Sequence, residues 1–269
     1  MTLVREDQGP FSELIENWFL LKRLIARDIK ARYQGSMFGT LWAFGTPLLL
    51  LFAYWFVLGV MLQAKWGAVP SKLYPVILFS GLIVHLFGAD VLGRAPMLII
   101  ENGTYVKKVV FPLATLQWMA VATAAFHLLI NLLILLAGQL LIAGHLPATW
   151  PLIIVVIVPL LPLLLGLSWF LSSIGTFLRD VQQVIPLLLT LMMFLSPIFF
   201  PMELVPERYR YLMYINPLTL IIVQVRVVAI EGSWPDFTAL SIYAVCSVIF
   251  MYAGYWWFCR TRKGFADVI

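Results

Sequence analysis

The sequence predicts an all-α polytopic membrane protein with six transmembrane helices, an N-terminal amphipathic interface helix and a re-entrant hairpin between spans five and six. Hydrophobic residues make up 62% of the 269 residues and charged residues only 12%, whereas an average soluble domain has about 25% charged residues. The apolar residues gather in long runs, which suit about 30 Å of hydrocarbon. A basic amphipathic stretch precedes the first run. A soluble core could not bury this much apolar surface, so the sequence predicts a chain that folds in a bilayer.

The first predicted element is the amphipathic helix, within a cytoplasmic segment 1–37. Its apolar residues recur at steps of three and four, which predicts one apolar helix face; they are Phe11, Leu14, Ile15, Trp18, Leu21, Ile25, Ile29 and Tyr33. Basic residues populate the remainder, so we expect the helix to lie in the headgroup plane. Two interpretations fit: a simple membrane anchor, or a docking surface for a cytoplasmic partner, to which Asp28 and Lys30 offer charge. Gly35 and Gly39 form the hinge into the first span.

A single transmembrane domain, 38–259, and a short cytoplasmic tail, 260–269, follow the hinge. The six predicted spans are 38–62, 73–100, 112–143, 151–178, 184–200 and 237–259. Pro159 and Pro162 predict a kink in the fourth span. The stretch 216–230 is apolar but short, and Gln224 and Arg226 interrupt it. We therefore interpret it as a re-entrant or interfacial hairpin on the outer side, protected by protein neighbours.

The distribution of positive charge predicts the orientation. In this topology most of the 18 Lys and Arg residues lie on the side of the two termini. Those on the opposite side are Lys65, Lys72, Arg208, Arg210 and Arg226. Because cytoplasmic loops carry the excess of Lys and Arg, both termini are predicted to be cytoplasmic.

Several function classes find no support in the sequence. The net charge of +5 is explained by membrane orientation, so we predict no nucleic-acid partner. Cys246 and Cys259 lie too far apart along one predicted helix to form a disulfide, and the three histidines are scattered singly, so we predict no metal site and no catalytic residue. No phosphate-binding Gly-x-x-x-x-Gly-Lys-[Ser/Thr] motif occurs, so nothing here cradles a nucleotide in the P-loop manner.

Four motifs carry a resemblance to a known family. They are RDIKARYQGSMFGTLW (27–42, followed by Pro47), ENGTYVKKVVFPL (101–113), FLRDVQQV with LSPIFFP behind it (177–201), and INPLTLIIVQVR (215–226). In this order and spacing the chain resembles the permease subunits of type-2 ABC exporters, most closely the branch that exports O-antigen, capsule and teichoic-acid polysaccharides. The resemblance covers essentially the whole chain.

The resemblance implies a homodimer in the bacterial inner membrane with a pore between the subunits. It also implies two copies of a separate ABC ATPase subunit, which bind ATP and Mg, so that this chain needs no cofactor of its own. The expected substrate is a lipid-linked polysaccharide. Three alternatives stay open: an exporter of a drug or small lipid-like molecule, an ion-coupled secondary transporter, and a membrane enzyme. Matched inverted repeats would indicate the transporter, and converging acidic or histidine groups the enzyme.

The resemblance also suggests which residues couple transport to ATP hydrolysis. The loop 101–111 looks like the element that fits a groove on the ATPase, although its lysines also satisfy the positive-inside rule. The predicted coupling residues are Arg27, Asp28, Lys30, Glu101, Lys107, Lys108, Arg179 and Asp180. Asp90, Arg94 and Glu101 share one helical face, where charges serve either a structural ion pair or transport.

Aromatic side chains are the candidate substrate path, because their faces suit the C–H faces of sugar rings. The predicted path residues are Phe38, Trp42, Phe52, Phe56, Phe194, Phe199 and Phe200, and the predicted outer gate consists of Glu203, Tyr209, Tyr211 and Tyr214. The alternative for any single residue is packing or an aromatic belt at the membrane interface.

Overall fold

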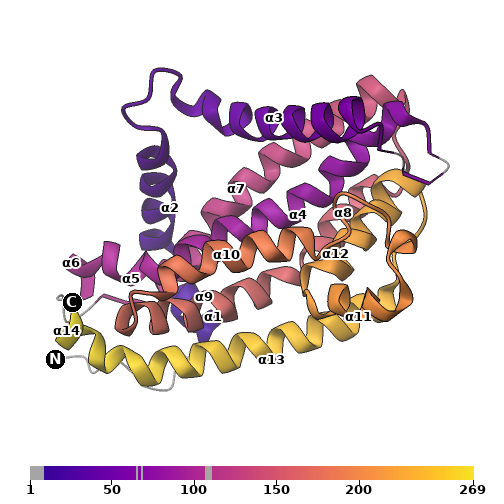
Figure 1. The fold of residues 1–269 in the computed structure, drawn as a ribbon. Coiled ribbons are helices and arrows are strands. Elements are labelled where there is room, and N and C mark those ends of the chain that lie inside the picture. The colour runs from indigo at the N-terminus through magenta and orange to yellow at the C-terminus, as the bar shows by residue number, and fades with distance from the viewer. Residues whose placement is uncertain (1–8, 65, 68, 107–110) are drawn as a thin grey trace.

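The computed structural model describes residues 9–269 except 65, 68 and 107–110, and the described chain is built from helices and turns (Figure 1). The α-helices are α1 (Pro10–Glu16), α2 (Trp18–Tyr33), α3 (Trp42–Tyr54), α4 (Tyr74–Arg94), α5 (Leu98–Glu101), α6 (Gly103–Val106), α7 (Thr115–Gly138), α8 (Ile153–Ile157), α9 (Leu160–Phe177), α10 (Val181–Phe194), α11 (Glu207–Ile215), α12 (Leu218–Arg226), α13 (Phe237–Thr261) and α14 (Phe265–Val268). This confirms the all-α prediction.

Within the described part of the chain, five helical stretches are long and apolar enough to cross a membrane. They are Gly39–Met61, Ser71–Glu101, Thr115–Ala143, Trp150–Phe177 and Phe237–Val268, and they match predicted spans one to four and six. The predicted kink in the fourth span is present as a break between α8 and α9, at Val158 and Pro159. The spans run side by side in Figure 1.

The predicted fifth span, 184–200, is shorter and begins earlier than expected. Its helix α10 has 14 residues, which corresponds to about 21 Å. Beyond Phe194 the chain turns: the Ser196 hydroxyl donates to the Met193 carbonyl oxygen at 2.8 Å, and the Ile198 amide donates to the Ser196 carbonyl oxygen at 2.7 Å. Pro197, which has no amide hydrogen to continue a helix, lies in this turn.

The predicted folded-back segment is confirmed as a pair of helices bent by 104°, Glu207–Ile215 and Leu218–Glu231. Asn216 lies in the bend, where its Oδ1 accepts from the Leu218 amide at 3.0 Å and its Nδ2 donates to the Met192 carbonyl oxygen at 2.7 Å. Arg226 of α12 is buried. Its guanidinium donates to the carbonyl oxygens of Pro197 and of Ile198, the latter at 3.1 Å, and therefore ties α12 to the turn that follows α10.

The core lies around α4, and α9 packs closely on α13. A Cβ added at Gly166 of α9 would lie 2.6 Å from the carbonyl oxygen of Phe250. A Cβ added at Gly254 of α13 would lie 2.7 Å from the carbonyl carbon of Gly166. These distances are shorter than real Cβ contacts, so glycine at both positions lets the two backbones touch, as small residues do in membrane interfaces.

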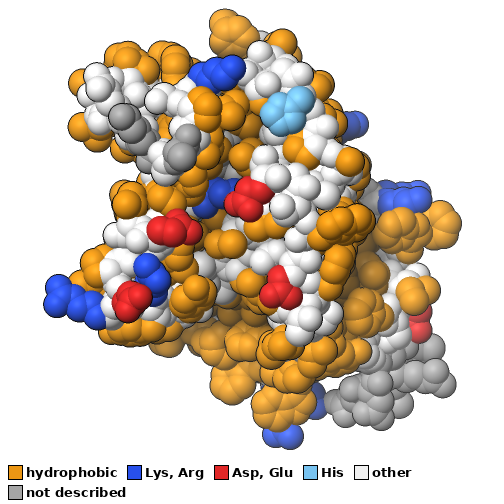
Figure 2. Space-filling model, turned by 90° about the vertical axis from the view of Figure 1, so that its right-hand side faces the viewer, with side chains coloured by type: hydrophobic (Ala, Val, Ile, Leu, Met, Phe, Trp, Pro, Cys, Tyr) orange, Lys and Arg blue, Asp and Glu red, His pale blue; other side chains and the backbone are white. Residues whose placement is uncertain are grey.

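The first span packs differently from the second. Only 6% of the residues in its most apolar stretch are buried, against 78% in the second span. In Figure 1, α3 runs along one edge of the bundle, and α2 crosses one end of it. We call that end, where α5, α6 and α14 also lie, the α2 end, and the opposite one the α11 end. Figure 2 looks onto the α11 end, a hollowed surface on which side chains of both charges lie among hydrophobic ones.

The hinge between α2 and α3 depends on two glycines with positive φ, +85° at Gly35 and +52° at Gly39. An L-residue in this region costs about 1–2 kcal/mol. We expect Gly35→Ala to lower the thermal unfolding midpoint of the detergent-solubilised protein by about 2–6 °C. Gly9→Ala is the control, because Gly9 has φ −71° and open space around it. Equal midpoints for the two variants would contradict the role of the hinge.

Candidate functional site

Two ion pairs join the interface helix to the second span. Arg94 donates to both carboxylate oxygens of Asp28 at 2.8 and 2.9 Å, and Arg32 donates to both oxygens of Asp90 at 2.7 and 3.1 Å. On each helix the acid precedes the base by four residues, which places both charges on one face. The two helices therefore present complementary patterns to each other. Of the alternatives for Asp90 and Arg94, the structure shows the ion pairs.

Asp28, predicted to contact a cytoplasmic partner, is mostly covered by the rest of the chain. Its side chain is only 13% exposed and faces Arg94 rather than solvent. Burial raises the pKa of the Asp28 carboxyl, but the hydrogen bonds and charge of Arg94 outweigh burial and hold that pKa below its usual range. Asp28 is therefore an ionised structural residue that fixes α2 across the end of the bundle.

A histidine and a tyrosine extend the pair formed by Arg32 and Asp90. His127 of α7 places Nδ1 2.8 Å from Asp90 Oδ2, and its Nε2 lies 2.8 Å from the Tyr33 hydroxyl. This geometry favours the tautomer with hydrogen on Nδ1, which donates to Asp90, while Nε2 accepts from Tyr33. Among the described residues, no group of three or more His, Cys, Asp or Glu side chains is arranged to hold a metal ion.

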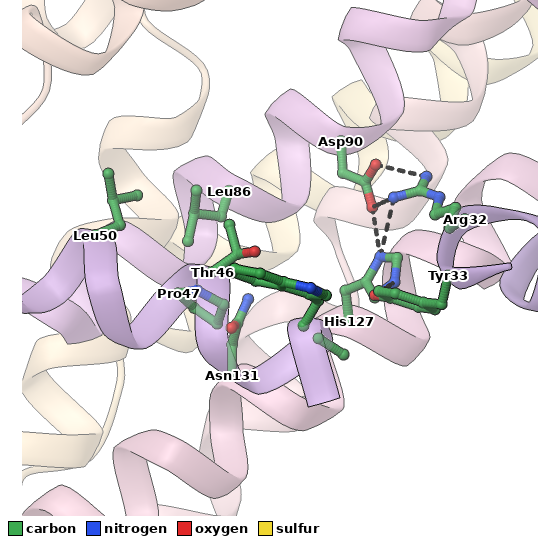
Figure 3. A pocket seen from close by; sticks show the side chains of 11 residues that line it. Arg32, Tyr33, Thr46, Pro47, Leu50, Leu86, Asp90, His127 and Asn131 are labelled. Atoms are coloured by element: carbon green, nitrogen blue, oxygen red, sulfur yellow. Dashed lines mark hydrogen bonds and ion pairs between the residues drawn. The ribbon is translucent and has the colours of Figure 1, made fainter. Parts of the chain in front are cut away.

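These side chains form one wall of a cavity of about 380 Å³ between α2, α3, α4 and α7. Figure 3 shows Asp90, Arg32, His127 and Tyr33 joined by hydrogen bonds on one side of it. Apolar residues line much of the remainder; they include Trp42, Pro47, Leu50 and Leu86. The cavity is therefore polar on one side and apolar on the other.

The predicted coupling residues lie at the α2 end where the structure describes them. Arg27 donates to the Tyr105 hydroxyl of α6 and lies over its ring at 5.4 Å. It thus joins α2 to the loop predicted to fit the ATPase. Lys30, Glu101, Arg179 and Asp180 are exposed. Lys107 and Lys108 lie outside the described residues.

The predicted path aromatics fall into three groups. Phe38 and Trp42 meet edge to face with ring centroids 5.8 Å apart, and Phe52 stacks on Phe56 at 5.9 Å. All four are exposed along the first span. The third group lies at the end of α10 and just beyond it, where Phe199 is partly buried between Phe194 at 5.7 Å and Tyr54 at 5.1 Å.

The remaining predicted aromatic, Phe200, is partly exposed. The predicted gate residues lie at the α11 end. Tyr209, Tyr211 and Tyr214 are exposed by 45%, 60% and 69%. Glu203 and Tyr214 line a second cavity of about 400 Å³. Their roles as path and gate stay predictions.

The sequence-based reasoning missed the cluster of Arg32, Tyr33 and His127 around Asp90. Two signals could have indicated it. Asp28 with Arg32 and Asp90 with Arg94 share the same spacing and charge order, and His127 with Asn131 places two polar side chains one turn apart in a mostly apolar span. Each pair marks one helix face, but only the fold brings the faces together.

Comparisons with known proteins identify the family. Residues 20–230 match the model of the family described as ABC-2 type transporter. The O-antigen export system permease protein RfbA of Myxococcus xanthus is 29% identical over 264 residues, covering 96% of this chain and 98% of that protein. RfbA of Klebsiella pneumoniae is 26% identical over 253 residues, covering 93% and 95%. The polysialic acid transport protein KpsM of Escherichia coli is 25% identical over 245 residues, covering 87% and 90%. The chain belongs to the ABC-2 type transporter family.

Proposed function

We propose that this chain is the permease of an ATP-driven exporter that moves a lipid-linked, O-antigen-like polysaccharide from the cytoplasm across the bacterial inner membrane. The observation that carries the proposal is the match, along nearly the whole chain, to permeases named for O-antigen export and polysialic acid transport. The exposed aromatic side chains along the first span support it, because flat apolar faces suit sugar rings while imposing few directional hydrogen bonds.

The proposed exporter is a homodimer. The first span leaves most of its apolar surface uncovered, and α10 exposes Val184, Leu187, Leu188 and Leu191. A second copy would cover part of this surface and lipid the rest. In the proposed arrangement both termini are cytoplasmic, so the α2 end faces the cytoplasm.

Family membership implies an ABC ATPase partner, and we propose that two copies dock on the α2 end. The proposed contacts are Arg27, Lys30, Glu101, Lys107, Lys108, Arg179 and Asp180. Asp28 is not among them, because its carboxylate is paired with Arg94. Movement of the ATPase would reach α2 and the 101–111 loop together, since Arg27 joins them.

The test of this function is a disruption of the gene followed by measurement of surface glycan. Loss of surface polysaccharide with accumulation of lipid-linked polymer inside the cell is the expected result. Unchanged surface glycan, or loss of efflux of a small molecule instead, would overturn the polysaccharide assignment.

The coupling surface is tested with the double variant Lys107→Ala/Lys108→Ala in reconstituted vesicles. Coupling free energies between sites are on the order of 1–3 kcal/mol, so we expect stimulation of the ATPase by the permease to fall at least about fivefold, while membrane insertion is unchanged. The matched control is Lys65→Ala/Lys72→Ala, which removes two lysines predicted on the opposite side. Equal stimulation by both double variants would contradict the assignment.

A further inference from the structure

The cavity between α2, α3, α4 and α7 has the features of a ligand site. Its volume of about 380 Å³ lies in the range of about 300–1,000 Å³ typical of small-molecule sites. Its lining includes Arg32 and Tyr33 from the end of α2 and Trp42 from the start of α3, on the two sides of the hinge. It also lies at the α2 end, where the proposed substrate would begin its crossing.

The charges in this cavity balance one another. Asp90 receives two hydrogen bonds from Arg32 and lies 2.8 Å from His127 Nδ1. Arg32 and Asp90 therefore cancel, and a bound phosphate would meet the Asp90 carboxylate as well as the guanidinium. A hydroxyl group both donates and accepts, so it fits a wall of mixed donors and acceptors better than an anion does.

Asn131 supplies an independent observation. It lines the cavity, is only 6% exposed, and its Oδ1 is buried with no hydrogen-bond partner among the described residues. It follows His127 by one helical turn and shares its face of α7. A buried acceptor without a donor is unfavourable, because it has lost its hydrogen bonds to water and gained none in return. A ligand hydroxyl would supply the donor.

The opposite wall suits the apolar side of a sugar. Trp42 is 39% exposed, and its ring meets that of Phe38 edge to face. Pro47, Leu50 and Leu86 continue the apolar lining. A pyranose has one C–H face and a rim of hydroxyls, and this cavity offers an aromatic ring to the first and hydrogen-bonding groups to the second.

We propose that this cavity binds one sugar residue of the polysaccharide, stacked on Trp42 and hydrogen-bonded to Asn131 and to the Arg32, Asp90 and His127 cluster. The proposal rests on the proposed function and adds to it a site of defined composition at the α2 end. Trp42 was predicted as a path residue from the sequence; the polar partners follow from the structure.

The test measures the binding of methyl glycosides to the purified permease–ATPase complex by saturation-transfer NMR. The panel contains methyl glucoside, galactoside, mannoside, rhamnoside and N-acetylglucosaminide. We expect binding of at least one glycoside, weakened at least fivefold by Asn131→Leu and by Trp42→Ala. Asn131→Leu replaces a buried polar group by an apolar one of similar size, so its thermal unfolding midpoint should not fall below that of the wild-type protein. The matched aromatic control, Phe44→Ala, removes an exposed side chain of α3 that does not line the cavity and should leave binding unchanged.

Three results would overturn the site. One is binding of no glycoside in the panel, and another is equal binding by the wild-type protein and Asn131→Leu. The third is direct binding of dodecyl phosphate that is tighter than the binding of every glycoside and is abolished by Arg32→Gln, which would indicate an anion site. Failure of the proposed function can be distinguished from failure of this site, because it appears as unchanged surface glycan on gene disruption, independently of the glycoside-binding results.

Discussion

Asp28→Arg should destabilise the permease severely, and the double reversal Asp28→Arg/Arg94→Asp should restore most of its stability. In the single variant, two guanidinium groups would meet where a carboxylate now accepts two hydrogen bonds. Breaking a buried pair by removing one partner costs about 3–5 kcal/mol, and the partial exposure of Arg94 places this pair near the lower limit. A loss of about 3 kcal/mol lowers the midpoint of a chain of this size by about 6–12 °C. Differential scanning fluorimetry in detergent measures it.

The control for this reversal is Arg23→Asp, which inverts an exposed charge on the same helix. Exposed substitutions usually change stability by less than about 0.5 kcal/mol, so its midpoint should stay close to that of the wild-type protein. A double reversal no more stable than Asp28→Arg would show that the two side chains do not act as a pair.

The low pKa of Asp28 fixes how this effect depends on pH. Because the folded-state pKa is lowered, the pair contributes its full stability above the unfolded-state pKa of about 3.9. That contribution is lost only as pH falls through the lower folded-state value. The stability difference between the wild-type protein and Asp28→Asn should therefore be constant from pH 8 to pH 5. A difference that shrinks within this window would mean that Asp28 titrates there and is not held by Arg94.

The spans could be predicted from sequence because their signal is local. The limits 38–62 and 73–100 differ by one or two residues from Gly39–Met61 and Ser71–Glu101, since the loss of apolar residues at a membrane surface is visible in any short window. The fifth span was predicted too long because apolar residues continue through 195–200, whereas the chain turns at Ser196 and Pro197. Composition alone does not distinguish an apolar turn from an apolar helix.

The candidate site could be predicted only in part. Trp42 and Arg27 were indicated by motifs, but the partners of Asp90 come from helices far apart in the chain. A single sequence carries no direct information on such pairings. Asp28 shows the converse: an acid on an amphipathic helix is usually exposed, whereas here Asp28 pairs with Arg94, the last residue of α4, and its side chain is only 13% exposed.

The second large loss of stability is expected from a substitution at the contact between α9 and α13. Gly254→Ala would place a methyl group 2.7 Å from the carbonyl carbon of Gly166. Both partners are helical backbone, which cannot rotate away as a side chain does, so the helices must separate. Overpacking of this kind costs about 1–3 kcal/mol, and the separation also loosens the neighbouring buried residues Met251 and Phe258.

Gly93→Ala is the matched control for Gly254→Ala, because it makes the same substitution inside a helix of the same bundle. Its added methyl group would lie 3.6 Å from Leu189 Cδ1, an ordinary contact. Alanine is a better helix former than glycine by about 1 kcal/mol, so Gly93→Ala should be neutral or stabilising. We expect the unfolding midpoint of Gly254→Ala to fall by about 3–10 °C, with Gly93→Ala equal to or above the wild-type value. If Gly254→Ala and Gly93→Ala have the same unfolding midpoint, the backbones of α9 and α13 are not in contact. The close approach at Gly166 then does not hold the last span to the bundle.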